Sequence, residues 1–95
     1  MARKSVKSEV VGRTQFTAKQ GQYLAFIHLY RKLHRQGPSE AEVCEYFRVS
    51  APTAHQMIVT LEGKSLVTRE AGVPRSVRVA VPAGDLPDLD DDEEG

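Results

Sequence analysis

The apolar residues of the first half of the chain recur at helical spacing. They stand three and four positions apart at Tyr23, Phe26, Ile27, Tyr30 and Leu33. This spacing places side chains on one face of an amphipathic helix, which Leu24 and Leu29 broaden. Thr17 and Gln20 have the residue types and the separation of a capping box, and Gly37-Pro38 is a helix-ending pair. The pattern predicts a first helix that starts at Thr17, ends before Gly37 and turns this face toward the core.

A second, shorter helix is predicted at about residues 40–47. Ser39 is its N-cap, and Glu42 completes a second capping box. We expect its inward-facing side chains to be Val43, Cys44 and Phe47. Arg48-Val49 follows directly and predicts a tight turn without glycine.

A third helix is predicted at about residues 51–63, after Ser50 as its N-cap. Pro52 falls in its first turn, where the missing N–H of proline carries no cost. Its apolar positions follow the i, i+3, i+4, i+7 pattern of one buried face, at Ala54, Met57, Ile58 and Leu61.

Two strand-like segments follow, at residues 66–69 and 77–81. In the second segment valines alternate with Arg78 and Ala80, as in a half-buried strand, and Gly72 and Pro74 mark the loop between the segments. Three short helices and a β-hairpin make a winged helix-turn-helix. The predicted fold is therefore mainly α with a small β-hairpin, over residues 16–82, with its wing at about 66–81.

The formal net charge of zero hides a strong asymmetry along the chain. Residues 1–84 hold all thirteen Lys and Arg with six acids, for a net charge of +7, whereas residues 85–95 hold seven acids and no base. We expect a flexible basic arm at 1–15 and a disordered acidic tail at 83–95. A basic domain favours nucleic acid or another polyanion as its ligand. The tail either competes with that ligand or serves as a solubilising terminus.

Several function classes are excluded by composition. Cys44 is the single cysteine, so no internal disulfide or cysteine-based metal site is expected, and the three histidines lack metal-ligand spacing. No nucleophile–base pair is visible, so we expect neither an enzyme nor a cofactor. No apolar stretch reaches the roughly 20 residues of a membrane span. The single cysteine favours a reducing, intracellular setting, so we expect the cytoplasm.

The third helix carries the functional prediction. In a helix-turn-helix this helix enters the major groove of duplex DNA, where Gln pairs with adenine and Thr hydrogen-bonds bases or phosphates. The expected DNA contacts are Ser50, Thr53, Ala54, His55, Gln56, Thr60 and Lys64 from this helix and its end, with Arg69, Arg75 and Arg78 from the wing. The alternative is a winged helix that binds another protein. Besides DNA, the sequence leaves open a second copy of the chain, in a homodimer, or another protein as a partner.

The order of short motifs resembles the DNA-binding domain of LexA repressors, over roughly residues 16–81. The matching segments are Phe-Thr-Ala-Lys-Gln at 16–20, Pro-Ser-Glu-Ala-Glu-Val at 38–43, Ser-Ala-Pro at 50–52 and Gly-Val-Pro-Arg-Ser-Val at 72–77. The resemblance implies a sequence-specific DNA-binding regulator of transcription.

Two departures from the LexA pattern limit what is carried over. The helix reads Thr-Ala-His-Gln-Met at 53–57, where LexA-like helices carry Asn-Ala-x-Glu-Glu, so the LexA operator preference is not transferred. The family's protease and dimerisation domain has no counterpart after the wing. We therefore expect a stand-alone domain without self-cleavage, similar to short LexA-like or MarR-like regulators.

Overall fold

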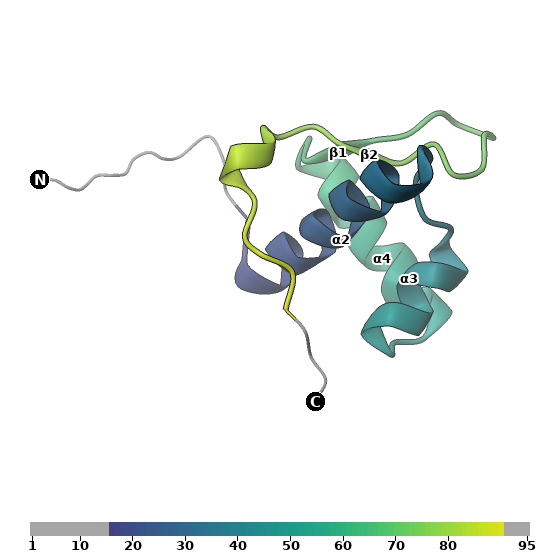
Figure 1. Cartoon of the computed structure of the whole chain (residues 1–95). Helices are drawn as coiled ribbons and strands as arrows, with labels where there is room; N and C mark the ends of the chain where they lie inside the picture. Colours follow the sequence, from purple (N-terminus) through teal and green to yellow (C-terminus); the bar gives the residue numbers. More distant parts are fainter. Residues whose placement is uncertain (1–15, 91–95) are drawn as a thin grey trace, which may run out of the picture.

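A computed structural model of the chain describes residues 16–90. Three helices pack together, and a two-stranded antiparallel hairpin lies across one end of them (Figure 1). In chain order the elements are α2 (Ala18–His34), α3 (Glu40–Phe47), α4 (Ala51–Gly63), β1 (Val67–Thr68), β2 (Arg78–Val79) and a 3₁₀ turn, η1 (Ala83–Asp85). The predicted winged helix-turn-helix is confirmed.

Local sequence sets the helix starts. Thr17 Oγ1 accepts from the Gln20 N–H at 3.1 Å, and Gln20 Oε1 accepts from the Thr17 N–H at 3.0 Å. Ser39 and Glu42 form the same reciprocal pair at 3.1 and 2.8 Å. Both predicted capping boxes are therefore present, and each satisfies two backbone donors that the first helical turn leaves unpaired.

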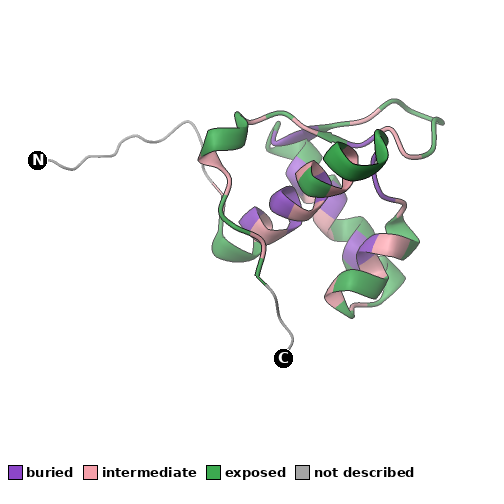
Figure 2. Cartoon of the chain, viewed as in Figure 1, coloured by how far each residue is buried: buried purple, intermediate pink, exposed green. Residues whose placement is uncertain are grey.

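The core lies where the three helices meet the hairpin (Figure 2). Tyr23 and Phe47 stack with ring centroids 4.0 Å apart and join α2 to α3. Of the four residues in the predicted inward face of α4, Ala54, Ile58 and Leu61 are buried, whereas Met57 is half-buried. The buried residues that form one cluster are Tyr23, Leu24, Ile27, Val43, Ala54, Ile58, Leu61, Leu66, Val67 and Val77.

Leu33 is a correction to the predicted core face of α2. Its side chain is 68% exposed, whereas Ile27 on the same helix is fully buried. Six residues of α-helix turn by about 600°, so Leu33 points roughly 120° away from Ile27. Helical spacing groups the apolar residues correctly, but it does not reveal how wide a sector the neighbouring helices cover.

The hairpin is shorter than its sequence pattern predicts. Val67 pairs with Val79 and Thr68 with Arg78, so two residues of each strand form the ladder. The hairpin lies close against the chain that follows α2. A Cβ at Gly37 would sit 2.5 Å from the carbonyl oxygen of Val77, and the Gly37 N–H donates to the main-chain carbonyl of Arg75 at 3.0 Å. Only glycine permits this approach.

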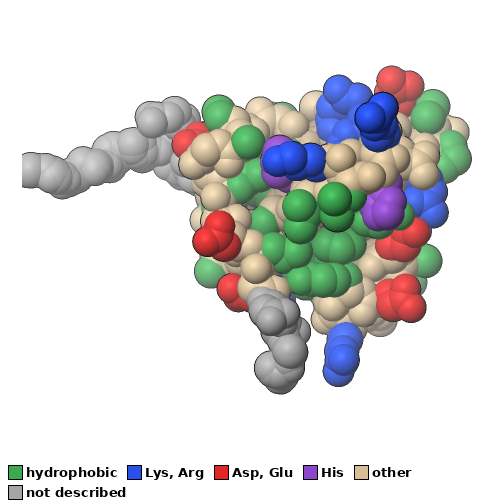
Figure 3. Space-filling model, in the orientation of Figure 1, with side chains coloured by type: hydrophobic (Ala, Val, Ile, Leu, Met, Phe, Trp, Pro, Cys, Tyr) green, Lys and Arg blue, Asp and Glu red, His purple; other side chains and the backbone are tan. Residues whose placement is uncertain are grey.

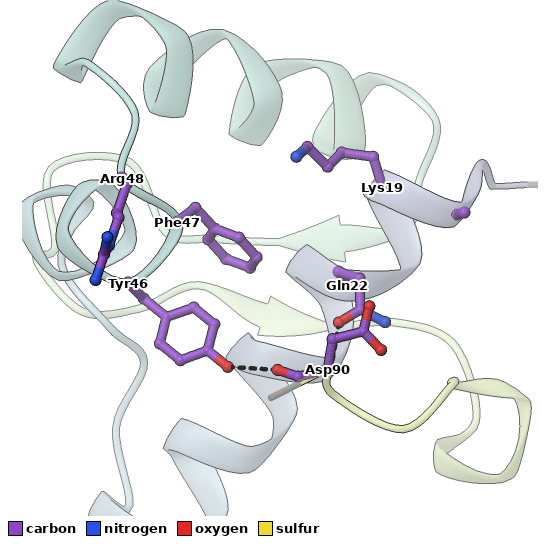
Figure 4. A pocket seen from close by; sticks show the side chains of 7 residues that line it. Lys19, Gln22, Tyr46, Phe47, Arg48 and Asp90 are labelled. Atoms are coloured by element: carbon purple, nitrogen blue, oxygen red, sulfur yellow. Dashed lines mark hydrogen bonds between the residues drawn. The ribbon is translucent and has the colours of Figure 1, made fainter. Parts of the chain in front are cut away.

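Residues 83–90 correct the prediction of a disordered tail from residue 83. After η1 the chain returns along α2, with Leu86 packed against the core cluster. Gln22 binds this segment through both ends of its amide: Nε2 donates to the Asp88 carbonyl at 3.0 Å, and Oε1 accepts from the Asp90 N–H at 2.7 Å. Tyr46 donates its hydroxyl to the Asp90 carbonyl at 3.0 Å (Figure 4).

The acidic composition of residues 83–90 concealed the apolar residues within it. Pro87 lies beside Gly21, where a Cβ would meet Phe16 and Pro87 at 3.0 and 3.1 Å. The absence of a side chain at Gly21 therefore lets two apolar rings settle on α2. Residues 91–95, like the predicted basic arm at 1–15, lie outside the described part of the chain.

Candidate nucleic-acid interface

Helices α3 and α4 are joined by a turn of three residues, 48–50. Arg48 adopts the left-handed conformation, with φ 58°, and the Val49 N–H donates to the Cys44 carbonyl at 3.1 Å. Ser50 then caps α4, with its side chain accepting from the Thr53 N–H. This is the predicted glycine-free turn. It directs α4 away from α3 and leaves one side of α4 on the surface.

The two sides of α4 differ in chemistry. Ala54, Ile58 and Leu61 are buried, whereas Thr53, Gln56 and Val59 are exposed. The exposed sector thus presents a hydroxyl, an amide and a small apolar side chain, and Gly63 extends it with open space around its Cα. Thr60 borders this sector and is half-buried. Short side chains of this kind permit close approach to the floor of a DNA groove.

Ala54 is a correction to the predicted contact set. It is fully buried, so its methyl group packs in the core and cannot touch a thymine methyl. Ala54 was also predicted to belong to the buried face of α4, and that prediction is confirmed.

At the start of α4, the hydroxyl groups of Ser50 and Thr53 differ in the hydrogen bonds that they can still make to DNA. Ser50 Oγ donates to Thr53 Oγ1 at 3.0 Å and accepts from the Thr53 N–H at 3.3 Å. The Ser50 hydroxyl is therefore used within the cap. Thr53 is left with its own hydroxyl proton to donate outward.

Two of the predicted DNA contacts, His55 and Arg69, pair with carboxylates at the edge of α4. His55 Nδ1 lies 2.7 Å from Glu40 Oε2, and Arg69 Nε lies 3.0 Å from Glu62 Oε1. A longer contact of 3.9 Å joins Arg69 to Glu40, so these residues connect α3, α4 and the wing. These ion pairs lie on the surface, so salt weakens them, and a phosphate group can take the place of the carboxylate.

Arg75 is engaged more firmly than a residue at a wing tip would be. Its guanidinium donates to Glu42 through two N–H groups, at 2.7 and 3.2 Å, and to the Tyr30 hydroxyl at 3.2 Å. The hydrogen bond from Arg75, followed by the one from the Ser39 backbone, lowers the pKa of Glu42 to about 2. The geometry thus differs from the expected free phosphate contact, because Arg75 fastens the hairpin loop to the start of α3.

A basic groove runs between the end of α2 and the wing, and sequence reasoning missed it. The cavity measures about 530 Å³, and its arginines include Arg31, Arg35 and Arg78. Arg31 reaches the Val77 carbonyl at 3.4 Å, and within residues 16–90 no carboxylate pairs with any of these three. Lys and Arg side chains gather on this part of the surface in Figure 3. Of these three arginines, the contacts predicted from the sequence include Arg78 but neither Arg31 nor Arg35.

The remaining predicted cation, Lys64, follows α4 and is exposed. Its ammonium group donates to Gln20 Oε1 at 3.0 Å, a neutral partner that leaves the positive charge uncompensated.

In the described part of the chain, no group of three or more His, Cys, Asp or Glu is placed to hold a metal ion. No helix within residues 16–90 has the length and apolar character needed to cross a membrane.

Comparison with curated proteins identifies relatives of one kind. The chain is 36% identical to the LexA repressor of Thermotoga neapolitana over 63 residues, which cover 66% of this chain and 32% of the relative. A LexA repressor from a strain of the same organism shows the same identity over 30% of its length. The chain therefore spans about a third of the length of the curated relatives it matches. No protein-family model matches it. The resemblance to LexA repressors is confirmed over the aligned residues.

Proposed function

We propose that this chain is a duplex DNA-binding domain of a transcriptional regulator, with α4 as the helix that enters the major groove. The observation that carries the proposal is the exposed, carboxylate-free sector of α4, held by the α3–turn–α4 unit. The similarity to proteins named repressors supports the same assignment. The domain acts by binding rather than by catalysis, in the cytoplasm and in association with the nucleoid.

Base reading is assigned to the middle of α4. The amide of Gln56 can donate to and accept from adenine N7 and N6 at once, and the Thr53 hydroxyl can donate to a base or to a phosphate. Val59 follows Gln56 by three residues, slightly less than one helical turn, and its exposed methyl groups can contact the methyl group of thymine. A correct base pair at the Gln56 position contributes about 1–3 kcal/mol of discrimination.

Phosphate binding is assigned first to the cations that no carboxylate neutralises. These are Arg31, Arg35, Arg78 and Lys64 in the described part of the chain. His55 and Arg69 join only when phosphate displaces Glu40 and Glu62. Each phosphate contact adds about −0.9 to the slope of log affinity against log salt. Three or four contacts therefore predict a slope of about −3, shallower than the domain's full complement of basic residues suggests.

The proposal is tested by selecting bound sequences from random duplex DNA and measuring affinity by fluorescence anisotropy across a salt series. Enrichment of one site together with a slope near −3 is the expected result. Absence of enrichment and a flat salt profile would instead favour the protein-binding winged helix.

Two glutamine substitutions locate the reading surface. Gln56→Ala should abolish the preference at one base position of the enriched site, because the bidentate amide is lost. Gln36→Ala is the matched control: it removes the same amide beside the basic groove, away from α4, and should leave every base preference intact. If Gln56→Ala also left the preferences intact, α4 would not be the reading helix.

A further inference from the structure

The basic groove lies on the far side of the hairpin loop from α4. Glu70, Val73 and Pro74, in the loop between the strands, line two cavities at once. One of these cavities also borders Glu62 near the end of α4, and the other is the basic groove. The strands follow the same order, because α4 packs against β1 and α2 packs against β2. The loop therefore separates the proposed reading helix from the arginines of the groove.

These arginines form a row. Arg31 and Arg35 stand four residues apart at the end of α2, which is about 6 Å along a helix axis. Arg78 pairs with Thr68 across the ladder, and both side chains are exposed on the hairpin. Among the described residues that line the groove, five are arginines and one, Glu70, is acidic. Such a row of cations attracts a chain of phosphates rather than a single charge.

The backbone conformation at Arg35 is a second sign of a ligand. Arg35 ends α2 in the left-handed region, with φ 64° and ψ 19°, where glycine is preferred to a residue with a side chain. Its side chain is exposed, and within residues 16–90 it has no ion pair or hydrogen bond that would offset this cost. Costly conformations of this kind cluster at ligand-binding sites.

The chemistry of the groove fits a sugar-phosphate backbone better than a free nucleotide. None of the described lining residues is aromatic, so the groove offers no ring on which a base could stack. Gln36 and Thr68 add neutral hydrogen-bonding groups beside the arginines. Side chains of these types hydrogen-bond phosphate and sugar oxygens in protein–DNA complexes, and a guanidinium can bind phosphate at two points.

We propose, on the basis of the proposed function, that the basic groove binds the DNA backbone outside the base pairs that α4 reads. When α4 occupies the major groove, the hairpin loop lies beside it, and Arg31, Arg35 and Arg78 contact phosphates beyond the loop. The binding site is then longer than the sequence that is read, and it is extended on one flank. Each phosphate contact adds about −0.9 to the salt slope, so these arginines account for most of the expected slope of about −3.

The test compares three duplexes that contain the enriched site. The core duplex ends at the last base pairs whose identity matters, and the other two extend it on one side by about ten base pairs, one turn of DNA. The wild type should bind one extended duplex at least several-fold more tightly than the core duplex at low salt, with a salt slope steeper by about 2 to 3. We call this ratio of affinities the flank gain. The opposite extension should add less.

Arg35→Gly separates the DNA contact from the stability of the fold. The variant removes the guanidinium and supplies the residue that the left-handed conformation prefers, so Tm should stay at or above that of the wild type. The flank gain should fall, and the difference in salt slope between extended and core duplexes should shrink by about 0.9. Adding Arg78→Gln should remove most of the remaining gain. Neither variant should change a base preference.

Arg48→Gly is the matched control. Arg48 has the same residue type and nearly the same conformation, with φ 58°, at the end of α3. The change should leave the flank gain as it is in the wild type. Because the flank gain is a ratio, an effect of Arg48 on the core duplex does not enter it.

Two results would overturn this proposal alone. One is equal affinity of the wild type for all three duplexes, and the other is a flank gain that Arg35→Gly and Arg48→Gly reduce equally. In either case an enriched site that depends on Gln56 would still support the proposed function. If no site were enriched and no duplex were bound, both proposals would be wrong.

A second measurement distinguishes the DNA backbone from a free phosphate compound. Pyrophosphate and ATP are titrated separately into the 95-residue chain, and binding is followed by isothermal titration calorimetry. We expect no saturable binding with a Kd below about 1 mM, because a short ligand meets only part of the row. Tighter binding that Arg35→Gly abolishes and Arg48→Gly preserves would show that the groove holds a free phosphate compound, and it would overturn the assignment to the DNA backbone.

Discussion

Arg75 and Glu42 join the hairpin loop to the first turn of α3 through two hydrogen bonds, of 2.7 and 3.2 Å. Glu42 Oε1 also accepts from the Ser39 N–H at 2.8 Å, so one carboxylate completes a helix cap and anchors the wing. Planar guanidinium and carboxylate groups suit this two-point contact, which lysine cannot reproduce. The Glu42 carboxylate therefore holds the hairpin loop against α3, alongside the Arg69 pairs with Glu62 and Glu40 and the contact of Gly37 with the hairpin.

We expect the stability of the domain to fall in acid as Glu42 is protonated. Its pKa in the folded chain is about 2, below the ordinary value of 4.5. A depressed carboxyl pKa contributes stability that is complete above the unfolded value and is lost as pH falls toward the folded value. Urea denaturation should show this loss between pH 4.5 and pH 2.

Comparison with Arg75→Gln isolates the contribution of this pair to the pH dependence. The variant should lower Tm by a few degrees near neutral pH, and its deficit relative to the wild type should shrink as pH falls to 2. A deficit that stays constant across this interval would mean that Arg75 stabilises the fold without the Glu42 charge.

The anchored C-terminal segment gives a second prediction. Gln22→Ala removes both amide contacts to residues 88 and 90, which lie 66 and 68 positions away in the chain. The Asp90 N–H should then exchange with solvent at least several-fold faster in hydrogen-exchange mass spectrometry or NMR. Gln36→Ala, the same change outside the segment, should leave this rate unaltered. Equal rates in wild type and Gln22→Ala would show that Tyr46 and Leu86 hold the segment without Gln22.

Leu61 supplies a third prediction, on the core. It is fully buried between α4 and the rest of the cluster, so Leu61→Ala should cost about 2–5 kcal/mol. In a domain this small, that is a large part of the total free energy of unfolding. By the usual relation between stability and melting temperature, Tm should fall by roughly 10 °C or more. Val59→Ala, on the exposed side of the same helix, should change the free energy of unfolding by less than about 0.5 kcal/mol. Similar losses for both variants would mean that the burial of α4 is misassigned.

The sequence predicts features whose cause is local. Both capping boxes, the Ser50 cap and the buried stripe of α4 follow from residue types within one or two helical turns, and all are present. The alternation around Arg78 likewise identified the second strand. Such features are decided by neighbours in the chain, so no knowledge of the packing is needed.

The missed features depend on residues that are distant in the chain. Leu33 is exposed because the other helices do not reach the outer sector of α2, and Arg75 is withdrawn from the wing tip by Glu42, 33 positions earlier. Residues 83–90 are ordered because Gln22 captures main-chain atoms, which carry no sequence signal. Composition described this segment as acidic and could not show what its backbone binds.

The anchoring of Asp90 sharpens the hypothesis that the acidic residues compete with DNA. Asp90 lines one cavity with Lys19 and Arg48, and Arg48 belongs to the turn that leads into α4 (Figure 4). Four acids follow it in the sequence at positions 91–94. Because they directly follow Asp90 in the chain, we expect these acids to be present near that turn at a high effective concentration, on the order of millimolar. Since a specific site adds base contacts, these acids should compete mainly with nonspecific DNA.

Deleting residues 91–95 tests this competition without removing Leu86 or the Gln22 contacts. The shortened chain should bind random duplex several-fold more tightly at low salt, and the gain should shrink as salt rises because both interactions are screened. Affinity for the enriched site should change less. The matched control replaces Asp91, Asp92, Glu93 and Glu94 by Asn and Gln, which keeps the length and removes the charge. If both variants bound random duplex as the wild type does, the acidic residues would be a solubilising terminus with no part in DNA binding.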